Sequence, residues 1–453
     1  MPNLPLARSF ALFIQFVCLA ALNSAPTEMV DALKRQAASD FPHLESLYKH
    51  LHAHPELSLH EVKTAARIAT ELKSAGAETT TGIGGNGVVA VLRNGPGPTV
   101  LVRGDLDGLP VKEETGLPYA SRATGPGHGD TLTPVMHACG HDVHSTVLVG
   151  TARALQALKP FWTGTVVLIA QPAEERGLGA RAMLTAGLYR DFPRPDYAIA
   201  LHVSATLPAG DVGTIEGPAM ANVDKLDILV RGIGGHGAYP HTTKDPIVLA
   251  SRIVVALQTI VSRETRPTEP AVVTVGSIHG GTKHNIIPDS VKLELTLRSY
   301  SDEVRTNTLA AVARICRGEA IAAGMPEELW PIVTPVEVPT PSVHNDPALT
   351  RRIRSSLLRV LGPDRVHQIE PEMAGEDFSH YGRTQERIPI CLFRLGVVSP
   401  ESLRRSQETG QSLPSLHSNK FAPAPSPSIE NGVVAMAAAV MDLLRTPASK
   451  ADP

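Results

Sequence analysis

The stretch MHACGHDVH (136–144) places three histidines, a cysteine and an aspartate within nine positions. Cys139 and His141 are separated by one residue, so from a tight turn both side chains can reach a single ion. Thiolate and imidazole are good ligands for Zn²⁺ and related divalent ions. The same pair also fits a cysteine nucleophile with a histidine base, or a buried structural cysteine before a polar helix. The stretch alone leaves these interpretations open.

Further polar side chains follow or end apolar runs. Glu174 and Glu175 follow GTVVLIAQP (164–172) after a single alanine, and His202 lies near the end of DYAIALHV (196–203). Adjacent carboxylates point in different directions, so one can ligate a metal while its neighbour polarises a water molecule. The ordinary alternatives are a solvated turn for the two glutamates and a hydrogen-bonded core histidine for His202.

Asp107 and His417 extend this set of polar residues. Asp107 follows TVLVRGD (99–105), where a carboxylate can accept a hydrogen bond from a ligand histidine and fix its tautomer. A turn aspartate is the equal alternative. His417 lies far downstream in SLHSNKF. Together the segments supply Cys, His, Glu, His and His, which suffices for two ions that share a bridging ligand.

The elements that must position these residues predict an α/β domain. Short apolar runs at 99–105, 164–172 and 196–203 are typical of buried strands, and helical patterns at 142–158 and 178–188 lie between them. This alternation favours a largely parallel sheet, in which ligands gather beyond the carboxyl ends of the strands. A helical pattern over 29–75 precedes the first strand. The last helix is predicted from about Glu430 to Leu444, after the Pro-rich loop APAPSPS.

The pattern changes near residue 222 to the order β-α-β-β-α-β, the ferredoxin-like split motif. Its predicted strands are 225–232, 271–278, 290–300 and 333–339, and its predicted helices are 245–263 and about 302–322. We therefore expect a small α+β domain at 222–336 inserted into a catalytic domain made of residues 29–221 and 337–448.

Nearly the whole chain after residue 45 carries motifs of one family. They are HAHPELSLHE, RGDLDGLPVKEETGLPYAS, MHACGHDVH, QPAEERGLGARAML, LHV, GIGGHGAYPH, GTKHNIIPD, AGEDFSHY and LHSNKF. With these motifs the sequence resembles the co-catalytic metallohydrolase superfamily of aminoacylases and zinc carboxypeptidases. It is most similar to the hippurate hydrolase and auxin-conjugate amidohydrolase subgroup. The resemblance implies a zinc-exopeptidase-like catalytic domain and two divalent ions per subunit (Zn, Mn, Co or Ni).

The resemblance also implies a role for each matched position. Cys139 would bridge the two ions, with Glu175 and His417 completing one shell and His141 and His202 the other. Glu174 would be the general base, and Asp107 would orient a ligand histidine.

For the inserted domain, the resemblance implies a lid that also forms a homodimer. Its His236 would reach the partner subunit's active site and stabilise the oxyanion. Asn285, in HNIIPD, would contact the substrate near the reacting carbonyl.

The expected activity is hydrolysis of the amide bond of N-acyl or N-aroyl amino acids. A dipeptidase or carboxypeptidase of the same superfamily is the alternative, as is a non-catalytic relative that binds a metal or ligand. A cysteine amidase would leave Glu175, His202 and His417 unexplained. One departure from the family pattern is Arg176, which follows the glutamate pair where relatives usually carry glycine.

Composition excludes some classes of partner. The 453 residues carry a formal net charge of −3 without a basic block, so we expect neither nucleic acid nor an anionic membrane surface as a partner. The cysteines Cys18, Cys139, Cys316 and Cys391 are widely spaced and do not form a disulfide framework.

The N-terminus resembles an export signal. Arg8 precedes the apolar run SFALFIQFVCLAAL, which is shorter than the roughly 20 residues that a membrane span needs. Residues 1–25 therefore predict a signal peptide, a secreted or periplasmic enzyme and no membrane contact in the mature form. A buried N-terminal helix is the alternative.

Overall fold

The computed structural model describes residues 8–127, 129 and 131–445, with the backbone alone for residues 8–26. The chain forms two compact units. The first unit comprises Met1–Thr214, Ala348–Ile369 and Cys391–Pro453, and the second comprises Ile215–Pro347 and Glu370–Ile390. The predicted inserted domain, 222–336, lies within the second unit, which also takes in flanking residues and the separate segment 370–390.

The first unit is built on an eight-stranded mixed sheet in the order β1-β2-β6-β3-β7-β18-β8-β17. Its strands are β1 (Glu78–Ile83), β2 (Gly87–Asn94), β3 (Thr99–Asp105), β6 (Gly164–Gln171), β7 (Tyr197–Pro208), β8 (Val212–Thr214), β17 (Val366–Gln368) and β18 (Ile390–Val398). β3 runs parallel to both β6 and β7, whereas β1 and β2 add antiparallel strands at one edge. The predicted mixed, largely parallel sheet is therefore confirmed. Its central strands are buried along almost their whole length, which explains their near-continuous apolar sequences.

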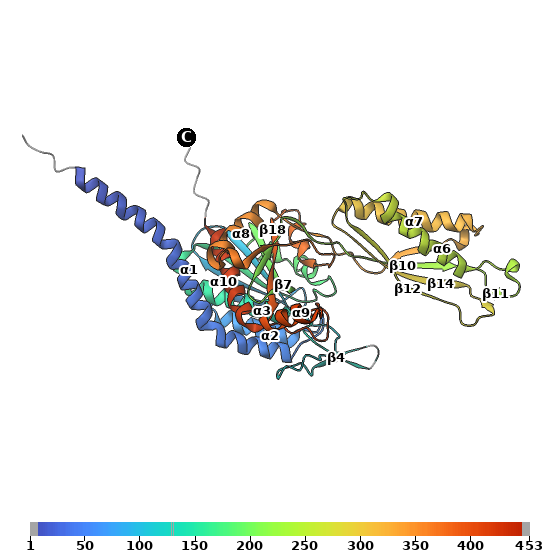
Figure 1. The fold of residues 1–453 in the computed structure, drawn as a ribbon, viewed down its shortest axis with the longest axis horizontal. Helices are drawn as coiled ribbons and strands as arrows, with labels where there is room; N and C mark the ends of the chain where they lie inside the picture. The colour runs from blue at the N-terminus through green and yellow to red at the C-terminus, as the bar shows by residue number, and fades with distance from the viewer. Residues whose placement is uncertain (1–7, 128, 130, 446–453) are drawn as a thin grey trace, which may run out of the picture. The chain divides into compact units, whose positions relative to one another are not determined.

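Helices cover this sheet. They are α1 (Arg8–Ala53), α2 (Val62–Ser74), α3 (His141–Ala157), α4 (Gly179–Thr185), α5 (Leu188–Asp191), α8 (Pro347–Leu361), α9 (Pro400–Thr409) and α10 (Pro425–Leu444). α1, α3 and α10 pack against one another, and α3 and α10 also contact β3 (Figure 1). α3 is buried on nearly every side, so its sequence lacks the exposed polar face of an amphipathic helix. The predicted helical region 29–75 is two helices, because the chain leaves the first helix just before Pro55.

The predicted signal segment lies at the limit of the described chain. Residues 1–7 are outside the described residues, and residues 8–25 form the backbone of the first turns of α1. Within the described part of the chain, two helical segments, Pro246–Glu264 and Pro425–Leu444, are long and apolar enough to cross a membrane by length and composition alone. The second of them is 78% buried within the protein, as expected of a core helix.

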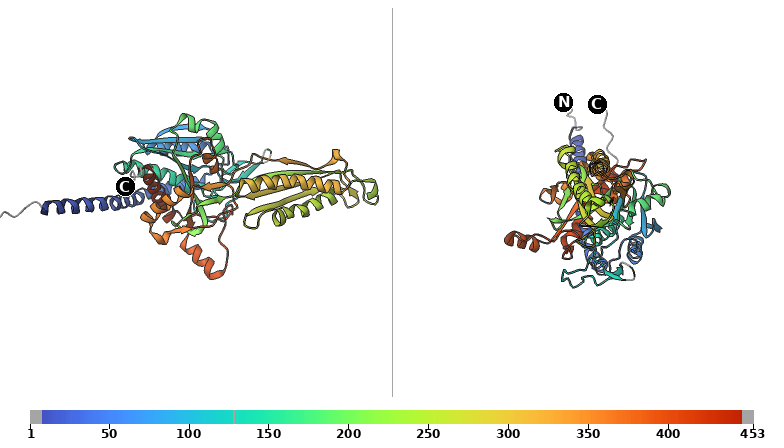
Figure 2. Two further views of the ribbon diagram at one scale, coloured as in Figure 1. Left: turned by 90° about the horizontal axis from the view of Figure 1, so that it is seen from above. Right: turned by 90° about the vertical axis from the view of Figure 1, so that its right-hand side faces the viewer.

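The second unit contains a four-stranded antiparallel sheet in the order β12-β14-β10-β15. Its elements in chain order are β10 (Asp224–Arg231), α6 (Pro246–Thr259), β12 (Ala271–Gly280), β14 (Ser290–Ser299), α7 (Asp302–Ala322) and β15 (Ile332–Pro335). This order confirms the predicted ferredoxin-like motif. Figure 2 shows α6 and α7 side by side along the sheet, and both helices contact β14. Alternate residues of β14, such as Leu293 and Leu295, are buried in the core of this unit.

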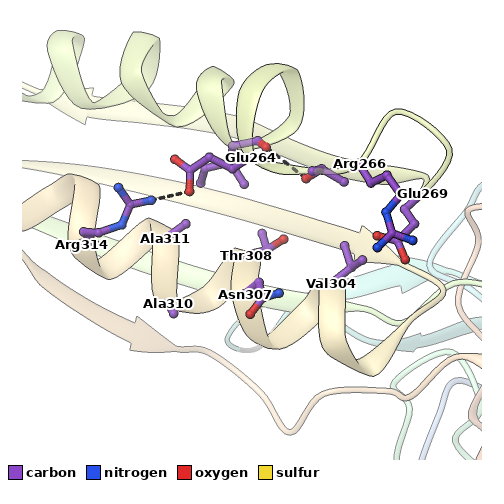
Figure 3. Close-up of a pocket in the computed structure, with 11 residues that line it drawn as sticks. Glu264, Arg266, Glu269, Val304, Asn307, Thr308, Ala310, Ala311 and Arg314 are labelled. Carbon is purple, nitrogen blue, oxygen red and sulfur yellow. Dashed lines mark hydrogen bonds and ion pairs between the residues drawn. The ribbon is translucent and has the colours of Figure 1, made fainter.

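Shorter strand pairs complete the two units. They are β4 (Thr124–Pro126) with β5 (Leu132–Pro134), β9 (Gly217–Met220) with β16 (Val343–Asn345), and β11 (Gly235–His236) with β13 (Ile286–Ile287). The second unit also has an open pocket of about 370 Å³ between α7 and the π-helical turn Ile260–Glu264 (Figure 3). Glu264 and Arg314 form an ion pair in its wall. None of the predicted site residues lines this pocket.

Candidate active site

The parallel strands of the first unit bring the predicted polar residues to one edge of the sheet. Asp105 ends β3 beside Gln171 of β6, and Glu174 lies three residues after the end of β6. β7 pairs in parallel with β3 and carries His202. Because carboxyl ends of parallel strands meet at the same edge, residues separated by nearly 100 positions become neighbours.

A tight turn before α3 supplies the next side chains. Gly140 lies between Cys139 and His141 with φ of +77°, in the left-handed region that favours glycine. A Cβ atom at this position would lie 2.6 Å from Cγ2 of Val203. Glycine is therefore required both by the backbone and by the close packing of the turn against β7.

The loop before α10 delivers His417 to the same place. His417 has φ of +66°, which is unusual for a residue with a side chain. Its backbone N–H donates to the carbonyl oxygen of Ala138 at 2.8 Å, which ties the loop to the Cys139 turn. Backbone strain of this kind persists where surrounding contacts fix it, and it clusters at functional sites.

The five predicted ligands form two groups that share one residue. The donor atoms of Cys139, His141 and His202 lie within 4.8 Å of one another, and so do those of Cys139, Glu175 and His417. The thiol of Cys139 lies 3.5 Å from Nε2 of His202. Oε1 of Glu175 lies 3.5 Å from Nε2 of His417. These two groups are the sets that the family resemblance implies.

His202 presents a single free nitrogen to its group. Its Nδ1 donates to the carbonyl oxygen of Val203 at 2.8 Å, so the lone pair lies on Nε2, on the side of the Cys139 thiol. Burial, together with the positive charge of Arg394, lowers the pKa of His202 well below its ordinary value. The ring is therefore neutral, which is the form that ligates metals.

Glu174 and Asp107 occupy the same cluster without belonging to either group. Asp107 accepts hydrogen bonds from the backbone N–H groups of Glu174 at 3.2 Å and Glu175 at 3.0 Å, and from the Ser58 hydroxyl at 2.6 Å. It thus fixes the glutamate turn. Its Oδ1 also lies 3.3 Å from Nδ1 of His141. The Glu174 side chain is only 9% exposed, and its Oε2 lies 3.9 Å from Nε2 of His141.

The electrostatics of Cys139 argue against a thiol nucleophile. Burial and the negative charge of Glu175 raise the pKa of the Cys139 thiol. A catalytic cysteine needs the opposite shift, because the thiolate is the nucleophile. The nearby Cys139 thiol and Glu175 carboxylate raise the pKa of His417 to about 10.

The donor set fits two divalent cations. Among the residues that the structure describes, Nε2 of His141 and Oε1 of Glu175 are buried without a hydrogen-bond partner, whereas Nδ1 of His141 faces Asp107. Buried polar atoms are rarely left unsatisfied, so these two atoms point to a cation as the missing partner. Sulfur, imidazole and carboxylate ligands suit Zn²⁺ and its neighbours in the first transition row.

The remaining predicted residues lie in the second unit. His236 of β11 pairs with Ile286 of β13, and the N–H of Gly237 donates to the carbonyl oxygen of Asn285 at 2.8 Å. The structure therefore places His236 and Asn285 on neighbouring segments, and both are exposed. Arg176, in the first unit, is exposed in the turn after Glu175.

Sequence reasoning missed two buried residues of the site. Asp105 and His144 form a hydrogen bond of 2.6 Å directly behind the ligand groups. His144 stands three residues after His141 on α3, a spacing that puts both on one helix face. That spacing was a usable signal. Its partner Asp105 is distant in the chain, so the pair itself was not visible.

Comparisons with known proteins identify the family of this chain. The model of the peptidase family M20/M25/M40 matches residues 101–411. The chain belongs to this family. It is 37% identical to the N-acetyl-L-cysteine deacetylase of Bacillus subtilis over 347 residues, covering 75% of this chain and 77% of the relative. It is 33% identical to the IAA-amino acid hydrolase ILR1-like 4 of Arabidopsis thaliana over 368 residues, covering 81% and 80%.

A solved structure supports the same assignment. The YXEP protein of Bacillus subtilis, described as a dinuclear metal-binding peptidase of the M20 family, superposes with a TM-score of 0.71 at 28% identity. The match covers 90% of this chain and 99% of that protein. The predicted family, fold class and enzyme class are therefore confirmed: this member of the M20/M25/M40 family is a metal-dependent amide hydrolase.

Proposed function

We propose that this amide hydrolase cleaves N-acyl or N-aroyl amino acids between the acyl carbonyl and the amino-acid nitrogen. The observation that carries the proposal is the pair of donor groups sharing Cys139, with the Glu174 carboxylate beside them. The chain's relatives include one enzyme named for N-acetyl-cysteine and one for IAA-amino acids, both small acyl amino acids. Hippurate-like and auxin-conjugate-like compounds are the substrates to test first.

Two divalent ions fit the groups, one with His141 and His202, the other with Glu175 and His417, and Cys139 between them. Bound there, such ions supply Lewis acidity toward the amide carbonyl and make water acidic enough to lose a proton near neutral pH. Zn, Mn, Co and Ni all suit the donor set, and availability decides among them.

Glu174 is the proposed proton carrier. Its carboxylate takes a proton from the attacking water, and the oxygen of that water bonds to the amide carbon. The C–N bond then breaks, and Glu174 returns the proton to the leaving amine nitrogen. The products are a carboxylic acid and a free amino acid, so atoms and charge balance. Asp107 supports this role by holding the backbone of the glutamate turn.

His236 and Asn285 are the proposed contributions of the second unit. A histidine ring beside the reacting carbonyl can stabilise the oxyanion as it forms. An amide side chain can donate to the same oxygen or to the acyl group. The support is that both side chains are exposed on paired segments of one small loop region. Following the family resemblance, we propose that His236 serves the partner subunit of a homodimer and that Asn285 contacts the substrate.

The test is turnover of hippurate, an N-acetyl amino acid, an indole-acetyl amino acid and a dipeptide. We expect chelator to abolish activity and a divalent ion to restore it. Glu174→Gln should lower kcat by about 10²–10⁴-fold with unchanged metal content, because general acid–base catalysis contributes this much. His236→Gln should lower kcat by about 10²-fold, as loss of an oxyanion donor does. His241→Gln, an exposed histidine of the same loop, is the matched control.

Each outcome decides between activities. Fastest turnover of the dipeptide would establish the peptidase alternative. Activity that resists chelator but is lost in Cys139→Ala would establish a thiol mechanism. Metal bound without turnover of any compound would contradict the proposal.

We also propose that residues 1–25 direct export to the periplasm or the medium. The support is the position of Arg8 before a short apolar run. Expression of the full chain, followed by cell fractionation and N-terminal sequencing, tests this. An intact N-terminus in the cytoplasmic fraction would contradict it.

A further inference from the structure

His144 is a buried histidine that the proposed chemistry leaves without a role. The residue is 2% exposed, and both ring nitrogens form hydrogen bonds. Nε2 accepts the backbone N–H of Val203 at 2.8 Å, so the proton of the neutral ring lies on Nδ1. Nδ1 donates this proton to Oδ1 of Asp105 at 2.6 Å. His144 therefore has no lone pair left for a metal ion, although it lies in the MHACGHDVH stretch.

Asp105 is itself held rigidly. Its other carboxylate oxygen accepts from Nη1 of Arg103 at 2.5 Å, and both side chains are completely buried. Its backbone carbonyl accepts from the Ser145 hydroxyl at 2.7 Å, which attaches the end of β3 to α3. The Asp105 carboxylate, which accepts the hydrogen bond from His144, is thus held in place, and it fixes the ring orientation of His144.

Val203 connects this pair to the ligands. While its N–H is held by His144, its carbonyl oxygen accepts the Nδ1 proton of His202 at 2.8 Å. Its side chain contacts the turn at Gly140, between two ligands. Val203 is therefore held by the hydrogen bond at its N–H and by the packing of its side chain. Its carbonyl oxygen determines which nitrogen of His202 faces Cys139.

We propose that His144, anchored by Asp105, is a positioning residue for the ligand His202. His144 fixes the backbone of Val203, and the carbonyl of Val203 holds the His202 ring with Nε2 directed to the side of Cys139. This inference rests on the proposed two-ion site. It adds a chain of hydrogen bonds that runs from Asp105 through His144 and Val203 to the ligand His202. Groups that orient ligand histidines typically change metal affinity by about 10–100-fold when they are removed.

Two amide variants separate the two hydrogen bonds of His144. His144→Asn retains an amide near the position of Nδ1, so it can donate to Asp105 but does not reach the N–H of Val203. His144→Gln retains an amide oxygen near the position of Nε2, so it can accept from Val203. The control is His52→Gln, another fully buried histidine of the first unit, which bonds to Asp142 and Glu113 instead.

The experiment is a Co²⁺ titration of the full chain followed by visible absorption, with unfolding measured in parallel. Wild type should bind two ions. His144→Asn should weaken one of the two by about 10–100-fold and alter its d–d absorption, while the other ion is unaffected. His144→Gln and His52→Gln should stay within a few-fold of wild type. Asp105→Asn removes the charge that anchors His144, so it should weaken binding of the same ion and alter the same absorption. It is the second probe if His144→Asn does not fold.

The outcomes distinguish this inference from the proposed function. Wild-type affinity and spectrum in both His144→Asn and Asp105→Asn would overturn the positioning role alone. Equal weakening in His144→Asn and His52→Gln would also overturn it, because a general loss of packing would then be the cause. Failure of wild type to bind two ions would overturn the proposed function together with this inference.

Discussion

Gly140 is the residue on which the geometry of both donor groups depends. Its positive φ and the 2.6 Å approach of a Cβ to Val203 act together. Gly410 shares the positive φ, at +70°, but has open space around it. Gly140→Ala should therefore lose more stability than Gly410→Ala, for which the left-handed backbone costs about 1–2 kcal/mol.

Denaturant unfolding and metal titration of the two variants measure this difference. We expect Gly140→Ala also to lose metal affinity, because the shifted turn carries Cys139 and His141. Equal unfolding free energies and full metal binding in both variants would contradict the assigned packing of this turn.

The sequence predicted the metal-binding residues better than the buried residues that hold them in position. Cys139, His141 and Glu175 belong to motifs whose spacing is local, so their types and positions indicate metal binding directly. The support given by Asp105 and His144 depends on a backbone N–H of β7, which no pattern of side chains reveals. A role that depends on a backbone group can be recognised only once the structure shows where each strand lies.

Among the elements, α6 and α9 both begin with a side-chain N-cap but differ in the core residues that they carry. Asp245 caps α6 by accepting from the N–H groups of Ile247 and Val248, and Ser399 caps α9 by accepting from Ser402. α6 buries residues such as Leu249 and Ile253 in the second unit. α9 has no buried residue.

Asp245→Ala should therefore lower the unfolding free energy by about 1 kcal/mol, the usual cost of losing an N-cap. Ser399→Ala should leave it almost unchanged, because α9 can fray without exposing a core. Thermal and denaturant unfolding of the two single variants measure this. A loss in Ser399→Ala as large as in Asp245→Ala would show that α9 is coupled to the fold.

The elements with strong apolar patterns were predictable, and those without were not. β3 and α7 match their predicted ranges because a buried run and a helical period mark their ends. β1 is polar and largely exposed, and among the described strands it pairs with β2 alone, so its own sequence gives little signal. The residues 370–390 of the second unit likewise belong there through contacts made far from them in the chain.

At the scale of the whole molecule, we place the contact of the proposed homodimer on the second unit. β12 lies at one end of its sheet and pairs with β14 alone within the described chain, so its outer edge has unpaired backbone groups. The neighbouring α6 exposes apolar side chains such as Val248 and Val255. A second copy of this chain can pair with that edge and cover those side chains.

Val255→Asp tests this surface, with Leu132→Asp in the β4–β5 hairpin as its control. Both side chains are 72% exposed, so neither substitution introduces a charge into the core. We expect light scattering to give twice the mass of one chain for wild type and Leu132→Asp, and the mass of one chain for Val255→Asp at low concentration. A buried, unpaired carboxylate at the interface would cost several kcal/mol, which is enough to separate the subunits.

Turnover of the Val255→Asp monomer then links assembly to chemistry. If His236 serves the partner subunit's active site, the monomer should lose about as much kcat as His236→Gln while binding metal normally. Adding inactive Glu174→Gln chains to His236→Gln chains should restore part of the activity, because mixed dimers then contain one complete site. A fully active monomer, or no restoration on mixing, would place His236 in the service of its own subunit or outside the reaction.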